Sequence, residues 1–465
     1  MSHCIAGDKA TGRNQGWTLV ACILASSLSF VDSSVLNVAL PAIRNSYSAA
    51  AQEVQWVVNA YLLPLSALLL LGGAVGDHYG RRLLLLLGTG LFAAASLICA
   101  LAPGINTLFA ARAAQGIGAA LLLPNSLALL NAAFQGEKRG RAVGVWAAAG
   151  AGAAAIAPLV GGWLVGSVGW PAIFYINLPL ALGAIALALR FVEESKETGS
   201  AHPDYAGALL ATGALGAGTY GLTLWSAMGH LTNAAIIALA IGAAMLGGFV
   251  LTEYWRAGRA MMPLALFKNR CFSALNLLTF LLYAAFGAAM LLIPYVLIAS
   301  GGYSPVQAGL ALLPLPMLMS SLSPKMGALA ARSGPRMLLT AGPLIVAAGM
   351  MLSRLVTPGA SYWAGVFPMI LLMGTGMTIA VAPLTSSVLG SVEEQHVAMA
   401  SGFNSAVART GGLFATALLG TVLASTGRQL FAGFDFAMYV AAAVSTIAGV
   451  LALTMLSAVT LRKGA

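Results

Sequence analysis

Long apolar stretches separated by short polar connectors dominate the pattern of hydrophobic and polar positions along this chain of 465 residues. A helix of about 20 residues crosses the hydrocarbon core of a bilayer, and fourteen stretches reach roughly that length. They lie near 17–41, 53–75, 83–102, 107–133, 142–167, 173–191, 205–225, 232–254, 271–299, 306–329, 337–356, 362–388, 398–424 and 437–460. The pattern predicts an all-α membrane protein with fourteen transmembrane helices.

Two longer connectors divide these helices into groups of six, two and six. The predicted order is a tail at 1–16, a six-helix bundle at 17–191, a connector at 192–204, an inserted helix pair at 205–254, a basic connector at 255–270, a second six-helix bundle at 271–460 and a tail at 461–465. Because the connectors are short, no room remains for an extramembrane domain.

The composition agrees with this interpretation and excludes other classes. Hydrophobic residues make up 59% of the chain and charged residues 8%, against roughly 25% charged in soluble domains. A water-soluble enzyme and a disordered chain are both excluded. The four cysteines and five histidines show no metal-ligand spacing, and no phosphate-binding loop is present. We therefore expect no cofactor, no metal and no ATP. The stretch beginning at Trp17 is too long for a signal-peptide core, so the first helix should be retained.

The net charge of +10 raises the question of a nucleic-acid partner. Eighteen of the 23 Lys and Arg residues fall in segments on one side of the predicted membrane topology. The other five are Arg44, Arg112, Arg354, Arg409 and Arg428. Loops rich in Lys and Arg stay in the cytoplasm. The charge therefore predicts a cell (inner) membrane protein with both termini in the cytoplasm, and no nucleic-acid partner.

A motif in the first bundle recurs in the second. The segments 73–82 and 327–336 each contain a glycine, a second glycine seven residues later, and Arg close behind. Each lies between the second and third helix of its six-helix group. The repeat indicates two related halves with the inserted pair between them.

The first of these loops combines Gly73, Gly80, Asp77, Arg81 and Arg82. The glycines allow two helix ends to approach, and the charged residues can form alternative salt bridges in two conformations. We expect a gating role for this loop and for Arg332 and Arg336 in the second loop. The alternative is a tight turn that serves membrane topology alone.

The 73–82 loop resembles the signature between helices 2 and 3 of the major facilitator superfamily, and fourteen spans with an extra central pair resemble its drug:proton antiporter branch. Further segments are similar to that branch: Asp32–Pro41, Trp56–Tyr61, Arg112–Ala120, Phe174–Pro179, Gly302–Gly309 and Ser401–Gly412. The resemblance implies the major facilitator fold, with two six-helix bundles plus two inserted central helices.

The fifth predicted helix is similar to the antiporter motif of this superfamily. Segment 150–162 is a run of small residues that ends in Pro158, Gly161 and Gly162, with Ala153 and Ala157 where the family usually has glycine. Small residues allow close helix packing, and proline removes a backbone donor. The resemblance implies that this helix seals the halves against leak. Plain packing of small residues is the alternative.

Asp32 is the sole acid well inside the spans of the first half, about 13 Å from Pro41 at 1.5 Å per residue. Ionisable groups inside a membrane are functional candidates by default. Ser26, Ser29, Ser33 and Asn37 share one side of this helix, which predicts a wet face. Burial would favour the neutral carboxyl and a nearby guanidinium the carboxylate. We expect Asp32 and Arg112 to couple protons, as the resemblance also implies. A permanently ionised structural pair is the alternative.

Arg409 falls near the middle of the thirteenth helix, where we expect a gating or helix-contact role. No central acid lies on helices 9 to 13, and the resemblance implies extra acids there for dicationic drugs. This favours monocationic or neutral substrates. The candidate substrate-binding residues, which are polar, aromatic or Met side chains, are Asn37, Asn59, Gln115, Tyr283, Phe286, Met290, Phe403 and Asn404.

The sequence thus predicts a secondary active transporter, and not an enzyme. It would exchange protons for lipophilic drugs or toxic compounds by alternating access, as a monomer in the bilayer. An exporter of an endogenous metabolite, such as a siderophore or antibiotic, is an alternative with the same machinery. A passive channel or a non-transporting receptor is a remote alternative.

Overall fold

The computed structural model describes residues 2–196, 203–256, 262, 264–393 and 396–456. Within these ranges the chain is helical with short connectors and no strands. The first half contains α1 (Ser2–Tyr47), α2 (Ala51–Tyr79), α3 (Arg81–Ala100), α4 (Ile105–Ala133), α5 (Gly136–Ser167), α6 (Ala172–Tyr175) and α7 (Asn177–Phe191). The inserted pair is α8 (Tyr205–Met228) and α9 (Asn233–Arg256).

The second half follows a 3₁₀ helix, η2 (Leu264–Lys268). It contains α10 (Arg270–Ala299), α11 (Pro305–Leu312), α12 (Pro314–Ser333), α13 (Arg336–Met350), the 3₁₀ helix η3 (Met351–Leu355), α14 (Val366–Gly390), α15 (Val397–Ala417), α16 (Gly420–Ala424) and α17 (Gly427–Met455). One predicted span, 306–329, is divided into α11 and α12, since Pro314 lacks the backbone N–H that would continue the hydrogen-bond ladder.

The predicted all-α membrane fold is confirmed. Twelve helical segments among the described residues are long and apolar enough to cross a membrane. The other two predicted spans, near 205–225 and 398–424, coincide with α8 and with α15 followed by α16. Glycine, threonine and serine lower the mean hydropathy of α8 and α15, so length rather than hydropathy indicates that they are spans.

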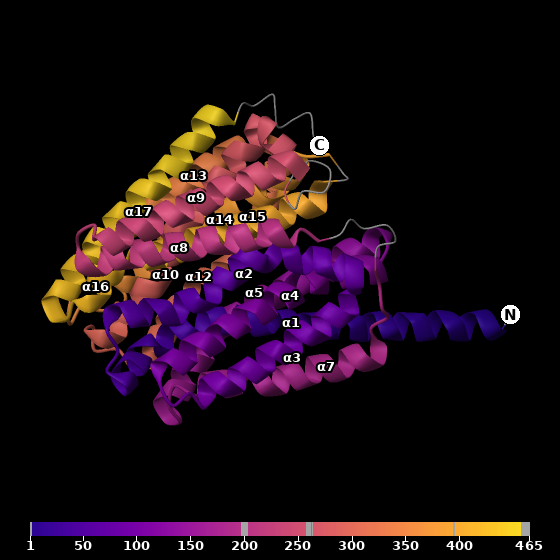
Figure 1. The fold of residues 1–465 in the computed structure, drawn as a ribbon, viewed down its shortest axis with the longest axis horizontal. Coiled ribbons are helices and arrows are strands. Elements are labelled where there is room, and N and C mark those ends of the chain that lie inside the picture. The colour runs from indigo at the N-terminus through magenta and orange to yellow at the C-terminus, as the bar shows by residue number, and fades with distance from the viewer. Residues whose placement is uncertain (1, 197–202, 257–261, 263, 394–395, 457–465) are drawn as a thin grey trace.

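Figure 1 shows two groups of helices that meet along one side, with α8 between α2 and α9. The turn between α2 and α3 lies at one end of the bundle, which we call the α2–α3 end. The turn between α1 and α2 lies at the opposite, α1–α2 end. Helices of the second half, such as α17, run at an angle to those of the first half (Figure 1), so the halves converge toward the α1–α2 end.

Contacts between the halves concentrate at the α1–α2 end. Arg44 donates hydrogen bonds to the Tyr295 hydroxyl and to the Leu423 carbonyl, the latter at 2.7 Å. Gln55 donates to the carbonyls of Thr416, at 2.8 Å, and Ala417, at 3.1 Å. A hydrophobic core cluster also continues from the second half into the ends of α1 and α2. The described conformation is therefore closed at this end.

Candidate functional site

An ion pair between α1 and α4 lies at the centre of the first half. The Arg112 Nη1 atom lies 2.5 Å from the Asp32 Oδ2 atom, and both side chains are 1% exposed. Arg112 also donates to the Val57 carbonyl, at 3.1 Å, and to Gln115 Oε1, at 2.9 Å. Since an unpaired charge is costly at this depth, the pair and its hydrogen bonds hold α1, α2 and α4 together.

Neutral polar side chains bind the second oxygen of the same carboxylate. Gln115 Nε2 lies 3.3 Å and Asn177 Nδ2 3.4 Å from Asp32 Oδ1. Both amides also reach Ser96 Oγ, at 2.8 and 3.3 Å. The network therefore draws on α1, α3, α4 and α7. Gln115 was predicted to contact substrate, but it is fully buried here as a partner of Asp32 and Arg112.

Aromatic rings cover the guanidinium. The Arg112 Cζ atom lies 4.5 Å from the ring centroid of Tyr61 and 5.9 Å from that of Phe174. The Tyr61 hydroxyl is 2.6 Å from Ser29 Oγ. A desolvated cation over such rings gains about 2 kcal/mol. The rings therefore exclude water from the pair and favour its persistence.

Part of the serine stripe on α1 is sealed from water in this conformation, which corrects the expected wet face at Ser26 and Ser29, whereas Ser33 is half-buried. Ser26 and Ser29 are each 1% exposed. Ser26 donates to Ser126 at 2.8 Å and accepts from the Trp146 indole at 2.9 Å. Side chains of neighbouring helices therefore form hydrogen bonds with these hydroxyl groups, which the sequence pattern had predicted to be hydrated. Asn37, farther along, is half-buried.

The α2–α3 turn contains the predicted charge cluster. Arg81 and Asp77 form an ion pair at 2.7 Å, one helical turn apart. Gly80 joins the two helices with a φ of +126°, which a side chain would strain. Gly73 lies on α2 against Pro124 of α4. The pair ties the end of α2 to the start of α3.

The connector after α7 also binds this turn, which the sequence motif did not indicate. The Glu194 carboxylate accepts hydrogen bonds from the backbone N–H groups of Arg82, at 2.9 Å, and Leu83, at 3.1 Å. Arg82 in turn donates to the Leu189 carbonyl at 2.7 Å. An anion at the N-terminus of a helix is stabilised by the helix dipole. The connector is therefore docked on α3.

The matching turn in the second half has the same backbone feature with different side-chain partners. Gly334, seven residues after Gly327, has a φ of +83°. Arg336 donates to the Leu453 carbonyl of α17, at 3.1 Å through Nε, and Arg332 is exposed. The two repeats therefore share a turn whose backbone favours glycine.

Helix α5 places its motif residues at two helix crossings. A Cβ atom at Gly161 would meet Val35 of α1, and one at Gly162 would meet the backbone of Pro305 in α11. A Cβ atom at Gly309 of α11 would in turn meet the backbone of Pro158. The halves thus touch backbone to backbone near the α1–α2 end. The sealing role of this contact stays a prediction.

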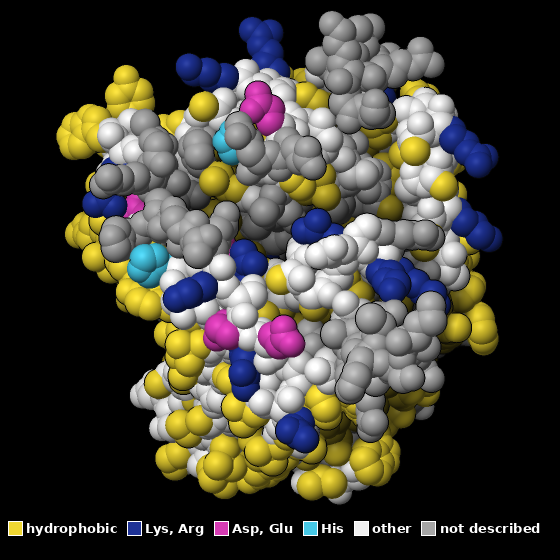
Figure 2. Space-filling model, turned by 90° about the vertical axis from the view of Figure 1, so that its right-hand side faces the viewer, with side chains coloured by type: hydrophobic (Ala, Val, Ile, Leu, Met, Phe, Trp, Pro, Cys, Tyr) yellow, Lys and Arg dark blue, Asp and Glu magenta, His cyan; other side chains and the backbone are white. Residues whose placement is uncertain are grey.

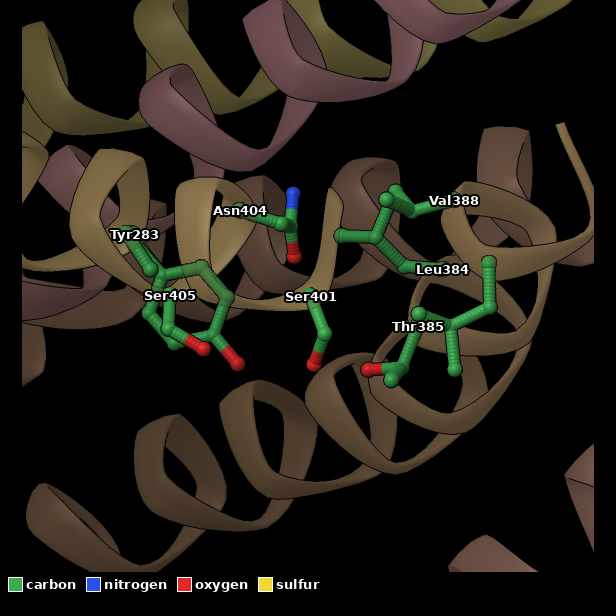
Figure 3. A pocket seen from close by; sticks show the side chains of 9 residues that line it. Tyr283, Leu384, Thr385, Val388, Ser401, Asn404 and Ser405 are labelled. Carbon is green, nitrogen blue, oxygen red and sulfur yellow. The ribbon is translucent and has the colours of Figure 1, made fainter. Parts of the chain in front are cut away.

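A small cavity of about 110 Å³ lies in the second half, toward the α2–α3 end. Figure 3 shows the hydroxyl groups of Tyr283, Thr385, Ser401 and Ser405 gathered around one space, with Asn404 beside it. Asn404 also donates to Thr279 Oγ1 at 2.7 Å. Tyr283 and Asn404, both predicted to contact substrate, line this cavity, which is rich in hydroxyl groups.

Four other residues that were predicted to contact substrate lie in packed surroundings in this conformation, and their role in binding stays a prediction. Asn59 is fully buried. Phe403 packs its ring against Phe267 and Phe272, with centroids 5.4 and 6.1 Å away. The half-buried side chains of Phe286 and Met290 pack against the hydrophobic core of the second half. None of the four lines the small cavity.

Arg409 lies in the middle of α15 and is half-buried. Within the described part of the chain it forms no ion pair and no hydrogen bond. Its helix packs against α2 of the first half and α10 of the second. Ala406, on the same side of α15 as Arg409, packs against the core cluster of the first half that contains Tyr61. The residue therefore faces the interface between the halves.

Comparisons with known proteins agree with this architecture. A family model described as Major Facilitator Superfamily matches residues 22–267. The chain is 34% identical to the multidrug resistance protein Stp of Mycobacterium tuberculosis (strain CDC 1551 / Oshkosh), over 89% of this chain and 76% of that protein. It is 31% identical to the tetracenomycin C resistance and export protein of Streptomyces glaucescens, over 92% and 80%. A solved POT family transporter, in complex with a thioalcohol-conjugated peptide, shares the fold with a TM-score of 0.68 at 14% identity, over 94% and 95% of the chains.

Proposed function

Because the chain belongs to the major facilitator superfamily of membrane transporters, we propose that it is a proton-coupled antiporter that exports lipophilic drugs or other toxic compounds. The observation that carries this proposal is the sealed Asp32–Arg112 pair, a titratable acid at mid-membrane depth. The resistance proteins to which the chain is similar support the export of toxic compounds. The protein would act as a monomer.

The distribution of charge supports an orientation in the membrane. Figure 2 looks onto the α2–α3 end, where dark blue Lys and Arg side chains are scattered over the face, while hydrophobic side chains cover the flanks. Arg139, Arg141, Lys196, Lys325 and Arg332 are exposed there. Short basic loops stay in the cytoplasm. We place this end and both termini inside the cell, so the closed α1–α2 end faces outward.

The coupling step would act on the tie between α1 and α4. When a proton binds the Asp32 carboxylate, the negative charge that holds Arg112 disappears. Arg112 then keeps only its neutral acceptors, the Val57 carbonyl and Gln115. Loss of this ion pair changes the relative free energies of the two conformations of the bundle. A bound proton would thereby shift the population from one conformation to the other. Release of the proton to the other side restores the pair.

The test replaces Asp32 in purified protein reconstituted into liposomes. Asp32→Asn should reduce export driven by an imposed pH gradient at least about a hundredfold, since the side chain can no longer bind and release a proton. Glu193→Gln, which alters an exposed acid of the connector after α7, is the control and should keep proton coupling. Wild-type gradient-driven rates in the Asp32→Asn protein would refute the proposal.

A second candidate function is export of a compound that the producing cell makes itself. It is favoured by the similarity to a protein named for resistance to and export of tetracenomycin C. Both functions use the same coupling site. Substrate-induced proton release from purified protein separates them, because a dedicated exporter responds to one chemical skeleton and a multidrug exporter to many.

A further inference from the structure

Arg409 is a permanent positive charge in the middle of a membrane span. The guanidinium stays protonated in proteins, and an intramembrane cation usually pairs with an acid or with carbonyl groups. Within the described part of the chain, Arg409 has neither an ion pair nor a hydrogen bond. None of the described contacts therefore supplies a negative charge that neutralises Arg409.

The remaining acids of the protein are poorly placed to supply that charge. Asp32 is already bound to Arg112, so this pair contributes no net charge to the centre. The other acids that the structure describes lie in connectors, near helix ends or, as Asp435 does, on α17, which packs against α10 and α13. Arg409 thus leaves the centre with one uncompensated positive charge.

The surroundings of Arg409 suit an anionic ligand. Tyr61 of the first half and Tyr283 of the second lie within electrostatic range of the guanidinium. Tyr283 also lines the cavity with Thr385, Ser401 and Ser405 (Figure 3). Ala408, the neighbour of Arg409, lines it as well. Hydroxyl donors beside a guanidinium can bind carboxylate or phenolate oxygens by charge-assisted hydrogen bonds.

We propose that Arg409, with Tyr283 and the hydroxyl groups of the adjacent cavity, binds the acidic group of the transported compound, so that the preferred substrates are lipophilic organic acids. This inference rests on the proposed export function and narrows its substrate class. The sequence had instead favoured a monocationic or neutral substrate. That prediction rested on the absence of central acids in the second half, and it assigned Arg409 no role in substrate binding. The apolar side chains that line the same cavity, those of Leu384, Val388 and Leu389, would receive the rest of the molecule.

The site is also placed to communicate with the proton site. Tyr61 lies under the Arg112 guanidinium at 4.5 Å and is within electrostatic range of both Asp32 and Arg409. An anion bound at Arg409 therefore lies one side chain away from the pair that the proton disrupts. In a one-for-one exchange, export of an anion against a proton moves about two charges per turnover, against about one for a neutral compound and none for a monocation.

The experiment uses three probes that share one apolar skeleton: pyrenebutyrate, its methyl ester and pyrenebutyltrimethylammonium. Liposomes containing the full protein should accumulate the carboxylate fastest under a pH gradient, with the largest dependence on membrane potential. Arg409→Gln should raise the KM for the carboxylate by roughly tenfold to a hundredfold and leave the ester within about twofold. Arg409→Lys should restore part of the affinity.

Arg354→Gln, which alters an exposed arginine of the same half, is the control and should change none of the three rates. An equal loss of all three probes in Arg409→Gln would overturn the inference, because it indicates a structural or gating role. A wild-type preference for the ammonium probe would overturn it while leaving the export function in place. Failure to drive any probe with the pH gradient would count against the proposed function itself.

Discussion

Asp32 and Arg112 form a buried ion pair whose contribution to stability can be separated by experiment from its proposed role in proton coupling. Both are buried, and each satisfies the charge of the other. Removing one partner of a buried pair leaves an uncompensated charge, which costs about 3–5 kcal/mol, whereas replacing both is often close to neutral. Stability and proton coupling therefore respond differently to single and double substitution.

Asp32→Asn alone should lower the thermal stability of the detergent-solubilised protein, since Arg112 stays charged without its counter-ion. Adding Arg112→Gln should recover most of that loss, because no buried charge remains. Gradient-driven export should stay absent in the double variant. Thermal unfolding followed by intrinsic fluorescence, together with liposome transport, measures both quantities. Recovery of coupled export in the double variant would instead indicate a purely structural pair.

At the scale of elements, the two repeated turns have similar backbones in different environments. Gly80 and Gly334 both adopt positive φ angles, +126° and +83°. A Cβ atom at Gly80 would lie about 2.7 Å from the Glu194 carboxyl carbon, whereas one at Gly334 would meet nothing within 4 Å. The first turn is packed under the connector that follows α7, and the second is open.

Gly80→Ala should therefore be the more damaging of two matched substitutions. Each introduces backbone strain of about 1–3 kcal/mol, but only Gly80→Ala also pushes Glu194 away from the N-terminus of α3. We expect a larger fall in thermal stability and in transport rate than for Gly334→Ala. Equal effects would mean that docking of the connector contributes nothing to either quantity.

The whole molecule is held together chiefly at its α1–α2 end. The hydrogen bonds of Arg44 and Gln55 and the backbone contact between α5 and α11 all lie there. In an alternating-access cycle these contacts must break while new ones form at the α2–α3 end. The described conformation is then one of two states.

Spin labels can follow this exchange. Labels at Gly140 of α5 and Ser333 of α12 report on the α2–α3 end, and labels at Val168 and Leu310 report on the α1–α2 end; all four positions are exposed. Protonation at low pH should shorten the first distance and lengthen the second, as measured by pulsed electron resonance. The same shift should be absent in Asp32→Asn. Distances that change in the same sense at both ends would exclude a rocking motion.

Much of the architecture could be predicted from the sequence. Because unpaired backbone groups are costly in a bilayer, each crossing must be a helix of sufficient length, and the apolar pattern shows that length directly. The repeated glycines indicated two related halves. Because a charge inside the membrane is costly, Asp32, Arg112 and Arg409 could be identified as candidate functional residues. Ser96 and Asn177 were missed. Short polar residues are common within spans, and their role depends on which helix faces them.

The amino-acid pattern was sufficient to predict the all-helical membrane fold with two bundles and an inserted pair, and to identify the intramembrane charged residues, since each follows from the local chemistry of a segment. The partners of these residues became known from the folded chain: Arg112 and Gln115 for Asp32, Glu194 for the α2–α3 turn, Arg44 for the second half, and no acid for Arg409 among the described residues. Partners depend on the rotation and packing of helices far apart in sequence. The apolar pattern specifies neither.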